Sequence, residues 1–96
     1  MVASFHDLAK VELNEAAQYY ESESPGLGAV FLTEAERSIT LILEHSESGP
    51  LVGRPVRRRL LRRFPYGLLY RIHGDQLRVL AVMNLRRRPG YWAGRT

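Results

Sequence analysis

The spacing of the apolar residues changes from helical to strand-like near residue 56, and this change limits the chain to a mixed fold. Over residues 9–20, apolar side chains recur every three or four positions, as on one face of an amphipathic helix. A second series with the same spacing covers residues 27–42. After residue 56, apolar and polar side chains alternate or form short apolar runs, which is typical of strands. The sequence therefore predicts helices first and a sheet afterwards.

Local signals mark the expected ends of the two helices. Residues 2–6 are expected to form a short strand, with Asp7 as the N-cap of the first helix. Ser24 and Pro25 should separate the helices, with serine as the second N-cap and proline at the first helical position. The second helix should fray near His45. So short a connection predicts an antiparallel helical hairpin.

Three strands are expected in the second half, at residues 57–63, 68–73 and 77–83, after a loop at residues 51–55. Gly74-Asp75 between the last two is a hairpin signal, because glycine suits the first position of a two-residue loop. The last strand should be central, since both of its faces are apolar. Simple alternation places four of its side chains on one face: Leu77, Val79, Ala81 and Met83.

These elements predict an α+β fold in one domain spanning residues 1–96. A short N-terminal strand should precede an antiparallel helical hairpin, which packs on a twisted antiparallel β-sheet. A basic C-terminal tail should follow the last strand.

Acidic and basic residues are divided between the two halves of the chain. Residues 1–50 carry two basic and nine acidic side chains, a net charge of −7. Residues 51–96 carry twelve arginines and one acid, a net charge of +11, which the total of +4 conceals. Arginine pairs bidentately with carboxylate and phosphate groups. The second half is therefore expected to bind an anionic partner.

Composition and motifs disfavour several other classes of protein. The chain has no cysteine, which excludes disulfides, thiolate catalysis and cysteine zinc sites. No apolar run approaches the roughly 20 residues of a membrane span, and the N-terminus does not resemble a signal peptide, so a cytoplasmic protein without membrane contact is expected.

Gly26 and Gly28 follow no strand and precede no lysine-serine pair, so no nucleotide site is implied. The acidic residues lack metal-ligand spacing; neither a metal nor a cofactor is expected.

Short motifs follow one another in a fixed order along nearly the whole chain. They are residues 12–16, Tyr19-Tyr20, residues 25–28 with Phe31-Leu32, residues 62–66 with Tyr70-Arg71, residues 80–82, and residues 86–92 with Arg95. Together they resemble the RelE/ParE toxin superfamily, with more weight on its ParE-like branch of plasmid stabilisation toxins. The resemblance implies growth arrest by the toxin of a type II toxin–antitoxin system. It also implies a heteromeric complex with a cognate antitoxin, whose acidic, partly disordered segment wraps around the toxin.

The resemblance implies one of two cellular targets, DNA gyrase for ParE-like toxins or messenger RNA on the ribosome for RelE-like endonucleases. The nuclease roles of that second branch would fall on Arg62, Arg87 and Tyr91. Two positions depart from its pattern, because Gly67 replaces an arginine and Asn84 replaces a histidine found in many relatives. Asparagine does not transfer protons at neutral pH. A non-enzymatic gyrase inhibitor is therefore favoured; the alternatives are a nuclease and an inactive basic module retained for its antitoxin.

The three histidines are not expected to supply the missing acid or base. His6 should cap a helix or face solvent, His45 should complement a helix dipole, and His73 should lie at the sheet edge. Tyr91 and Trp92 leave three interpretations open: stacking on bases, anchoring a protein interface, or packing on the sheet. The remaining candidates for binding the target or the antitoxin are Arg57, Arg59, Arg63, Arg71, Arg86, Arg88 and Trp92.

Overall fold

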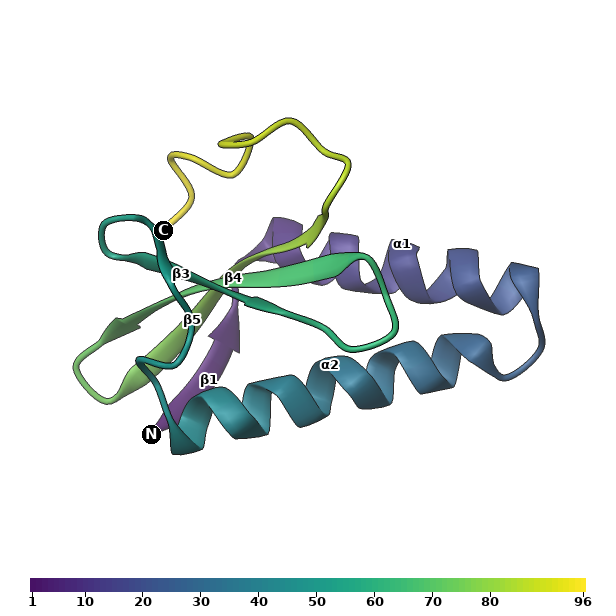
Figure 1. Ribbon diagram of the computed structural model, residues 1–96, viewed down its shortest axis with the longest axis horizontal. Helices are drawn as coiled ribbons and strands as arrows, with labels where there is room; N and C mark the ends of the chain where they lie inside the picture. Colours follow the sequence, from purple (N-terminus) through teal and green to yellow (C-terminus); the bar gives the residue numbers. More distant parts are fainter.

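The computed structural model describes residues 1–96 as a five-stranded sheet with two helices on one face (Figure 1). The elements in chain order are β1 (Val2–Phe5), α1 (Asp7–Glu23), α2 (Leu27–Glu44), β2 (Leu51–Gly53), β3 (Val56–Leu60), β4 (Tyr66–His73) and β5 (Gln76–Asn84). The strands are ordered β1-β5-β4-β3-β2 in the sheet. This arrangement confirms the predicted α+β class and the helical hairpin. Neither helix combines the length and the apolar character needed to cross a membrane.

The sheet is mixed, so the expectation of a wholly antiparallel sheet is wrong at one edge. β1 runs parallel to β5, with Phe5 opposite Val79, whereas the other neighbouring strands are antiparallel. No hairpin joins β1 to β5, because both helices and three strands lie between them in the chain, and a long crossover permits the parallel direction. The expected loop at residues 51–55 also contains a short edge strand, β2.

The helix starts differ from the predicted ones because other side chains cap them. His6, not Asp7, precedes α1, and its Nδ1 accepts a hydrogen bond from the Leu8 amide at 3.1 Å. Ser24 ends α1 instead of starting α2. The amides at the start of α2 are capped from the other helix, since the Glu21 carboxylate accepts from Gly26 and Gly28 at 3.0–3.1 Å.

The two helices approach closely at Gly28. A Cβ atom there would lie 2.6 Å from the carbonyl oxygen of Ala17 on α1. Only glycine allows the start of α2 to pack this tightly against α1. The close approach and the Glu21 cap together fix the hairpin that the short connection predicted.

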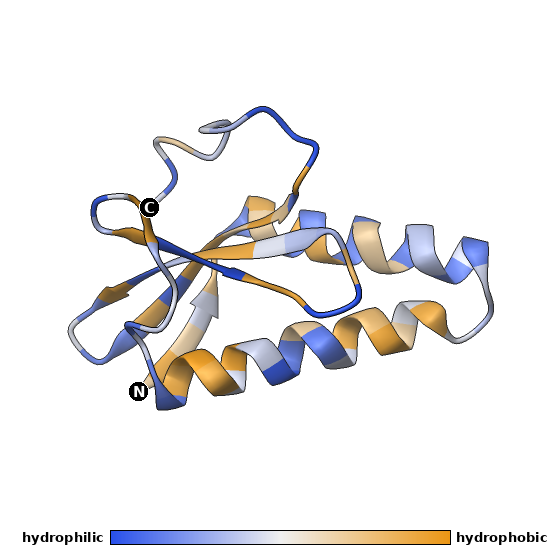
Figure 2. Ribbon diagram, viewed as in Figure 1, coloured by the Kyte–Doolittle hydropathy of each residue, from blue (hydrophilic) through white to orange (hydrophobic).

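Apolar side chains form one core under the helices and a second cluster on the opposite face of the sheet. Figure 2 shows hydrophobic residues on both helices and along the strands, and a strongly hydrophilic stretch soon after β5. The helix-side core includes Phe31, Ile42 and Tyr70, all fully buried. The second cluster comprises Val56, Leu69, Leu80, Ala81 and Met83, with Tyr91 and Trp92 packed against it.

A bulge in β5 decides which face each of its side chains occupies. Two consecutive residues of β4 pair with Val79 and Ala81, which leaves Leu80 as the extra residue. Leu77 and Val79 face the helices, whereas Leu80, Ala81 and Met83 belong to the opposite cluster. The prediction that Leu77, Val79, Ala81 and Met83 share one face is therefore wrong. One extra residue reverses the alternation, so that the side chains after the bulge point to the opposite face from those before it. The prediction that this strand lies inside the sheet and is buried on both faces is confirmed, since β5 lies between β1 and β4, although β1 pairs only with its first four residues.

Candidate functional site

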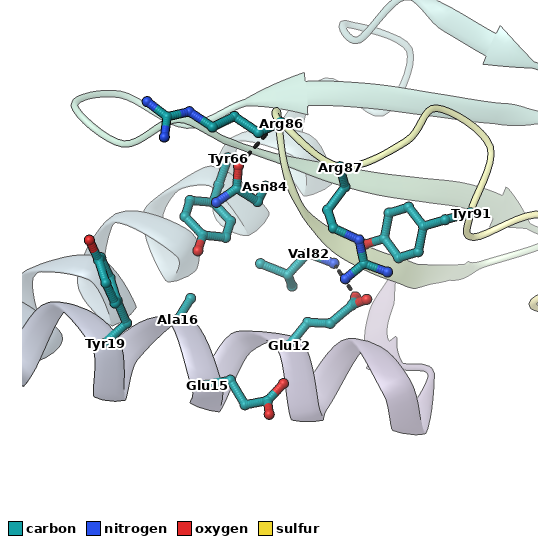
Figure 3. A pocket seen from close by; sticks show the side chains of 10 residues that line it. All are labelled: Glu12, Glu15, Ala16, Tyr19, Tyr66, Val82, Asn84, Arg86, Arg87 and Tyr91. Carbon is teal, nitrogen blue, oxygen red and sulfur yellow. Dashed lines mark hydrogen bonds between the residues drawn. The ribbon is translucent and has the colours of Figure 1, made fainter.

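A surface groove of about 410 Å³ lies between α1 and the segment that follows β5 (Figure 3). One wall consists of Glu12, Glu15, Ala16 and Tyr19 on α1. The remaining lining residues come from the strands and the tail: Tyr66, Val82, Asn84, Arg86, Arg87 and Tyr91. Two carboxylates lie on the α1 side of the groove; on the other side Arg87 points toward them, whereas Arg86 points away (Figure 3).

The groove lies beside an unpaired strand edge. β1 ends at Phe5, whereas β5 continues for several more residues without a partner strand on that side. Side chains occupy the free backbone groups instead. The Glu12 carboxylate accepts from the Val82 amide, and the Arg95 guanidinium donates to the Leu80 carbonyl, both at 3.0 Å. Backbone groups that already have hydrogen-bond partners cannot pair with a further strand. The side chains of Glu12 and Arg95 therefore block strand pairing at this edge of β5.

Glu12 and Arg95 also bind each other through two parallel hydrogen bonds of 3.0 Å. Both side chains are largely buried, with exposed fractions of 12% for Arg95 and 14% for Glu12. Bidentate pairing of this kind fixes geometry as well as charge. The pair therefore ties the C-terminal tail to α1 and to β5 at one point.

The Tyr91 ring lies between two guanidinium groups. Its centroid is 4.0 Å from Arg87 and 5.1 Å from Arg95, within the range of cation–π contact. The hydroxyl is buried and makes no hydrogen bond of acceptable geometry, although the Glu12 carboxylate lies near it. Burial, and next the Glu12 carboxylate, raise the pKa of the Tyr91 hydroxyl far above its usual range. At neutral pH this hydroxyl is protonated and turned inward.

The structure brings together two of the three residues assigned to nuclease chemistry. Arg87 and Tyr91 contact each other in the groove. Arg62 lies in the turn between β3 and β4 and does not line the groove; its amide donates to the Glu34 carboxylate of α2 at 2.6 Å. Asn84 lines the groove, and its side-chain oxygen accepts from the Arg86 amide at 2.9 Å. Asn84 thus stabilises the turn after β5.

The other candidate arginines are distributed over several places. Arg57 and Arg59 bind the loop after α2, through the Gly49 carbonyl at 2.8 Å and the Ser48 hydroxyl at 3.1 Å respectively. Arg86 lines the groove. The remaining three lie outside it: Arg63 beside α2, Arg71 at the far end of β4, and Arg88 exposed in the tail.

The histidines and Trp92 lie away from the groove. None of His6, His45 and His73 lines it. Trp92 packs with Tyr91 against the second cluster, which is the third of the interpretations for these aromatic residues. The pairing of Glu12 with Arg95 was not predicted from the sequence, although both residues occur in the family-like motifs. Nothing in their spacing indicated that they meet.

The chain thus combines a helical hairpin on a mixed sheet with an arginine-bearing groove where the last strand ends. A solved structure titled "Chromosomal ParDE TA system from P. aeruginosa" has the same fold, with a TM-score of 0.76 over 88% of this chain and 95% of the other, at 17% sequence identity. The chain belongs to the family described as ParE toxin of type II toxin-antitoxin system, parDE, whose model matches residues 3–89. No curated protein matches its sequence. The matched region ends before the tail that carries Tyr91, Trp92 and Arg95.

Proposed function

We propose that this ParE-family toxin stops growth by binding DNA gyrase, without catalysing a reaction. The observation that carries this proposal is the state of Tyr91, to which the family resemblance assigns acid or base chemistry, and of two further polar residues of the groove. The Tyr91 hydroxyl is buried with a raised pKa, Glu12 is held by Arg95, and Asn84 caps a turn. Cleavage through a 2′-hydroxyl needs a base and an acid that reach the substrate.

Family membership supports gyrase as the target, since ParE-like toxins are taken to act on it. Arg86, Arg87 and Arg88 are the candidate contact groups, because all three are exposed and directly follow the exposed apolar residue Leu85. Arginine, with tryptophan and tyrosine, is enriched among the residues that dominate the energetics of protein interfaces. Gyrase acts on chromosomal DNA, so the proposed location is the cytoplasm.

A cognate antitoxin is the second proposed partner. The net charge of +11 over residues 51–96 favours an acidic segment, and Arg86 and Arg87 lie on the accessible wall of the groove. An extended acidic segment that covers this wall would block any target that uses the same arginines.

The proximity of Arg87 and Tyr91 favours one alternative function, cleavage of messenger RNA on the ribosome. In that alternative Arg87 binds the scissile phosphate, Tyr91 turns outward to act as acid or base, and Arg62 contributes charge from a neighbouring turn. A third possibility is an inactive basic module, which growth arrest on expression without an antitoxin would dismiss.

The test compares both targets with the same purified toxin. Gyrase supercoiling and messenger RNA integrity on translating ribosomes are measured side by side, with and without antitoxin. Loss of supercoiling with intact messenger RNA is expected. Cleaved messenger RNA with unaffected gyrase would contradict the proposal and support the alternative.

A further inference from the structure

A second cleft, at the opposite end of β5 from the groove, is lined only by polar residues. It has a volume of about 250 Å³ and lies at the hairpin that joins β4 to β5. Its lining residues are Arg71, His73, Gln76, Arg78 and Thr96. No carboxylate side chain is among them, and the acid of the adjoining turn, Asp75, does not line the cleft. The proposed function makes no use of this place.

The cleft is built from two cross-strand pairs on the same face of the sheet. Arg71 is directly opposite Arg78, and His73 is directly opposite Gln76. Ile72 and Leu77, between these pairs, belong to the helix-side core, so the four polar side chains share the face that the helices leave open. Two like charges directly opposite each other on neighbouring strands are unfavourable unless a counter-charge lies between them.

The two arginines differ in how they are held. Arg78 is anchored by three hydrogen bonds, to the Ser4 hydroxyl at 3.3 Å, the Phe5 carbonyl at 3.0 Å and the Thr96 carbonyl at 3.3 Å. The guanidinium of Arg71 makes no hydrogen bond within the protein, and its Nε is buried without a partner. Buried donors of this kind are rarely left unpaired in folded proteins. Arg71 therefore has free donors beside an arginine already fixed in place.

We propose that this cleft binds a phosphate group. The terminal guanidinium donors of Arg71, the remaining Nη2 group of Arg78, the His73 ring and the Gln76 amide surround one small space. Four donor side chains match an oxyanion with three or four oxygens better than a flat carboxylate, and arginine binds phosphate through paired donors. A bound phosphate would pair with the unbonded terminal Nη groups of Arg71 and neutralise the like-charged pair. The phosphate is either inorganic or the terminal group of a small ester such as a mononucleotide.

The experiment is a titration of ¹⁵N-labelled protein at neutral pH and constant ionic strength, with chloride as the compensating anion. Inorganic phosphate is used in one series and adenosine monophosphate in the other. Backbone amides and arginine Nε–H groups are followed by NMR. Saturable shifts are expected at Arg71, His73, Gln76 and Arg78, with Arg71 Nε–H among the largest. The ligand with the lower Kd then identifies the source of the phosphate.

Two variants test the role of the arginine. Arg71→Gln should weaken phosphate binding by about tenfold or more, because it removes a charge-assisted, bidentate donor. Arg54→Gln, at an exposed arginine outside the cleft, should leave the Kd unchanged. The wild-type shift map decides the question even if Arg71→Gln does not fold. Shifts spread evenly over the exposed arginines, or the same loss in both variants, would overturn the proposal and leave only general charge attraction.

Discussion

Glu12 of α1 and Arg95 of the C-terminal tail hold each other through two 3.0 Å hydrogen bonds, across 83 residues of sequence. The same carboxylate accepts from Val82, and the same guanidinium donates to Leu80. One ion pair therefore closes the open edge of β5, fixes the tail, and orients Tyr91 and its neighbours beside the groove.

Replacing Glu12 by glutamine should destabilise the fold. Glu12→Gln leaves the Arg95 guanidinium largely buried without its counter-ion, and breaking a buried pair in this way costs about 3 kcal/mol. Urea denaturation measures the free energy of unfolding. Glu15→Gln, on the same helix but exposed, is the matched control and should change it by less than about 0.5 kcal/mol. Equal losses in the two variants would mean that the ion pair does not stabilise the tail.

Stability should fall at alkaline pH partly because of Tyr91. Burial raises the pKa of its hydroxyl in the folded protein, whereas the unfolded chain ionises near pH 10. Ionisation therefore favours the unfolded state, and the contribution of Tyr91 is present below about pH 10 and lost as the pH rises further. The fall in the free energy of unfolding between about pH 8 and pH 11 should be smaller in Tyr91→Phe than in the wild type. Identical pH profiles would contradict the burial of this hydroxyl.

Gly28→Ala should destabilise the helical hairpin, against the usual preference of helices for alanine. A Cβ atom 2.6 Å from the Ala17 carbonyl forces α1 and α2 apart, a change that costs about 1–3 kcal/mol. Alanine in place of glycine normally stabilises a helix by up to about 1 kcal/mol. Thermal denaturation should therefore show a lower midpoint temperature for Gly28→Ala than for the wild type. A higher midpoint temperature would show that the helices do not meet at this residue.

Association with the antitoxin should depend strongly on salt. The +11 charge of residues 51–96 attracts an acidic segment from a distance, and salt screens that attraction. Stopped-flow measurements should show a marked fall in the association rate between about 50 and about 500 mM salt. A rate that does not change with salt would indicate an apolar interface, and the arginines would then serve another purpose.

Periodicity in the sequence was enough to predict the helical hairpin and the central strand. It failed at β5, because the bulge at Leu80 turns the following side chains to the face opposite the helices. The apolar pattern of the sequence does not indicate this bulge. It also failed at the start of α2, where Glu21 of the preceding helix supplies the cap that was assigned to Ser24. Both features depend on how elements meet, which local patterns do not contain.

The site was only partly predictable for the same reason. Arg87 and Tyr91 are only four residues apart and contact each other in the groove, whereas the catalytic roles implied for them stay a prediction. The partner of Arg95 lies near the other end of the chain, and only the folded sheet edge brings Glu12 to it. Arg62 was grouped with the tail residues by analogy, but it lies in the β3–β4 turn, outside the groove, where its backbone amide donates to Glu34 of α2.

The most direct test of action by binding is the toxicity of Tyr91→Phe. This change removes only a buried hydroxyl that makes no hydrogen bond, so a toxin that acts by binding should lose no more than about 1.5 kcal/mol of affinity. A nuclease that uses this hydroxyl as acid or base would lose about 10²–10⁴-fold in rate. Gyrase inhibition and messenger RNA cleavage are measured for wild type and Tyr91→Phe together. We expect intact messenger RNA in both cases and gyrase inhibition that survives the substitution. Cleavage by the wild type that Tyr91→Phe abolishes would contradict the proposed function.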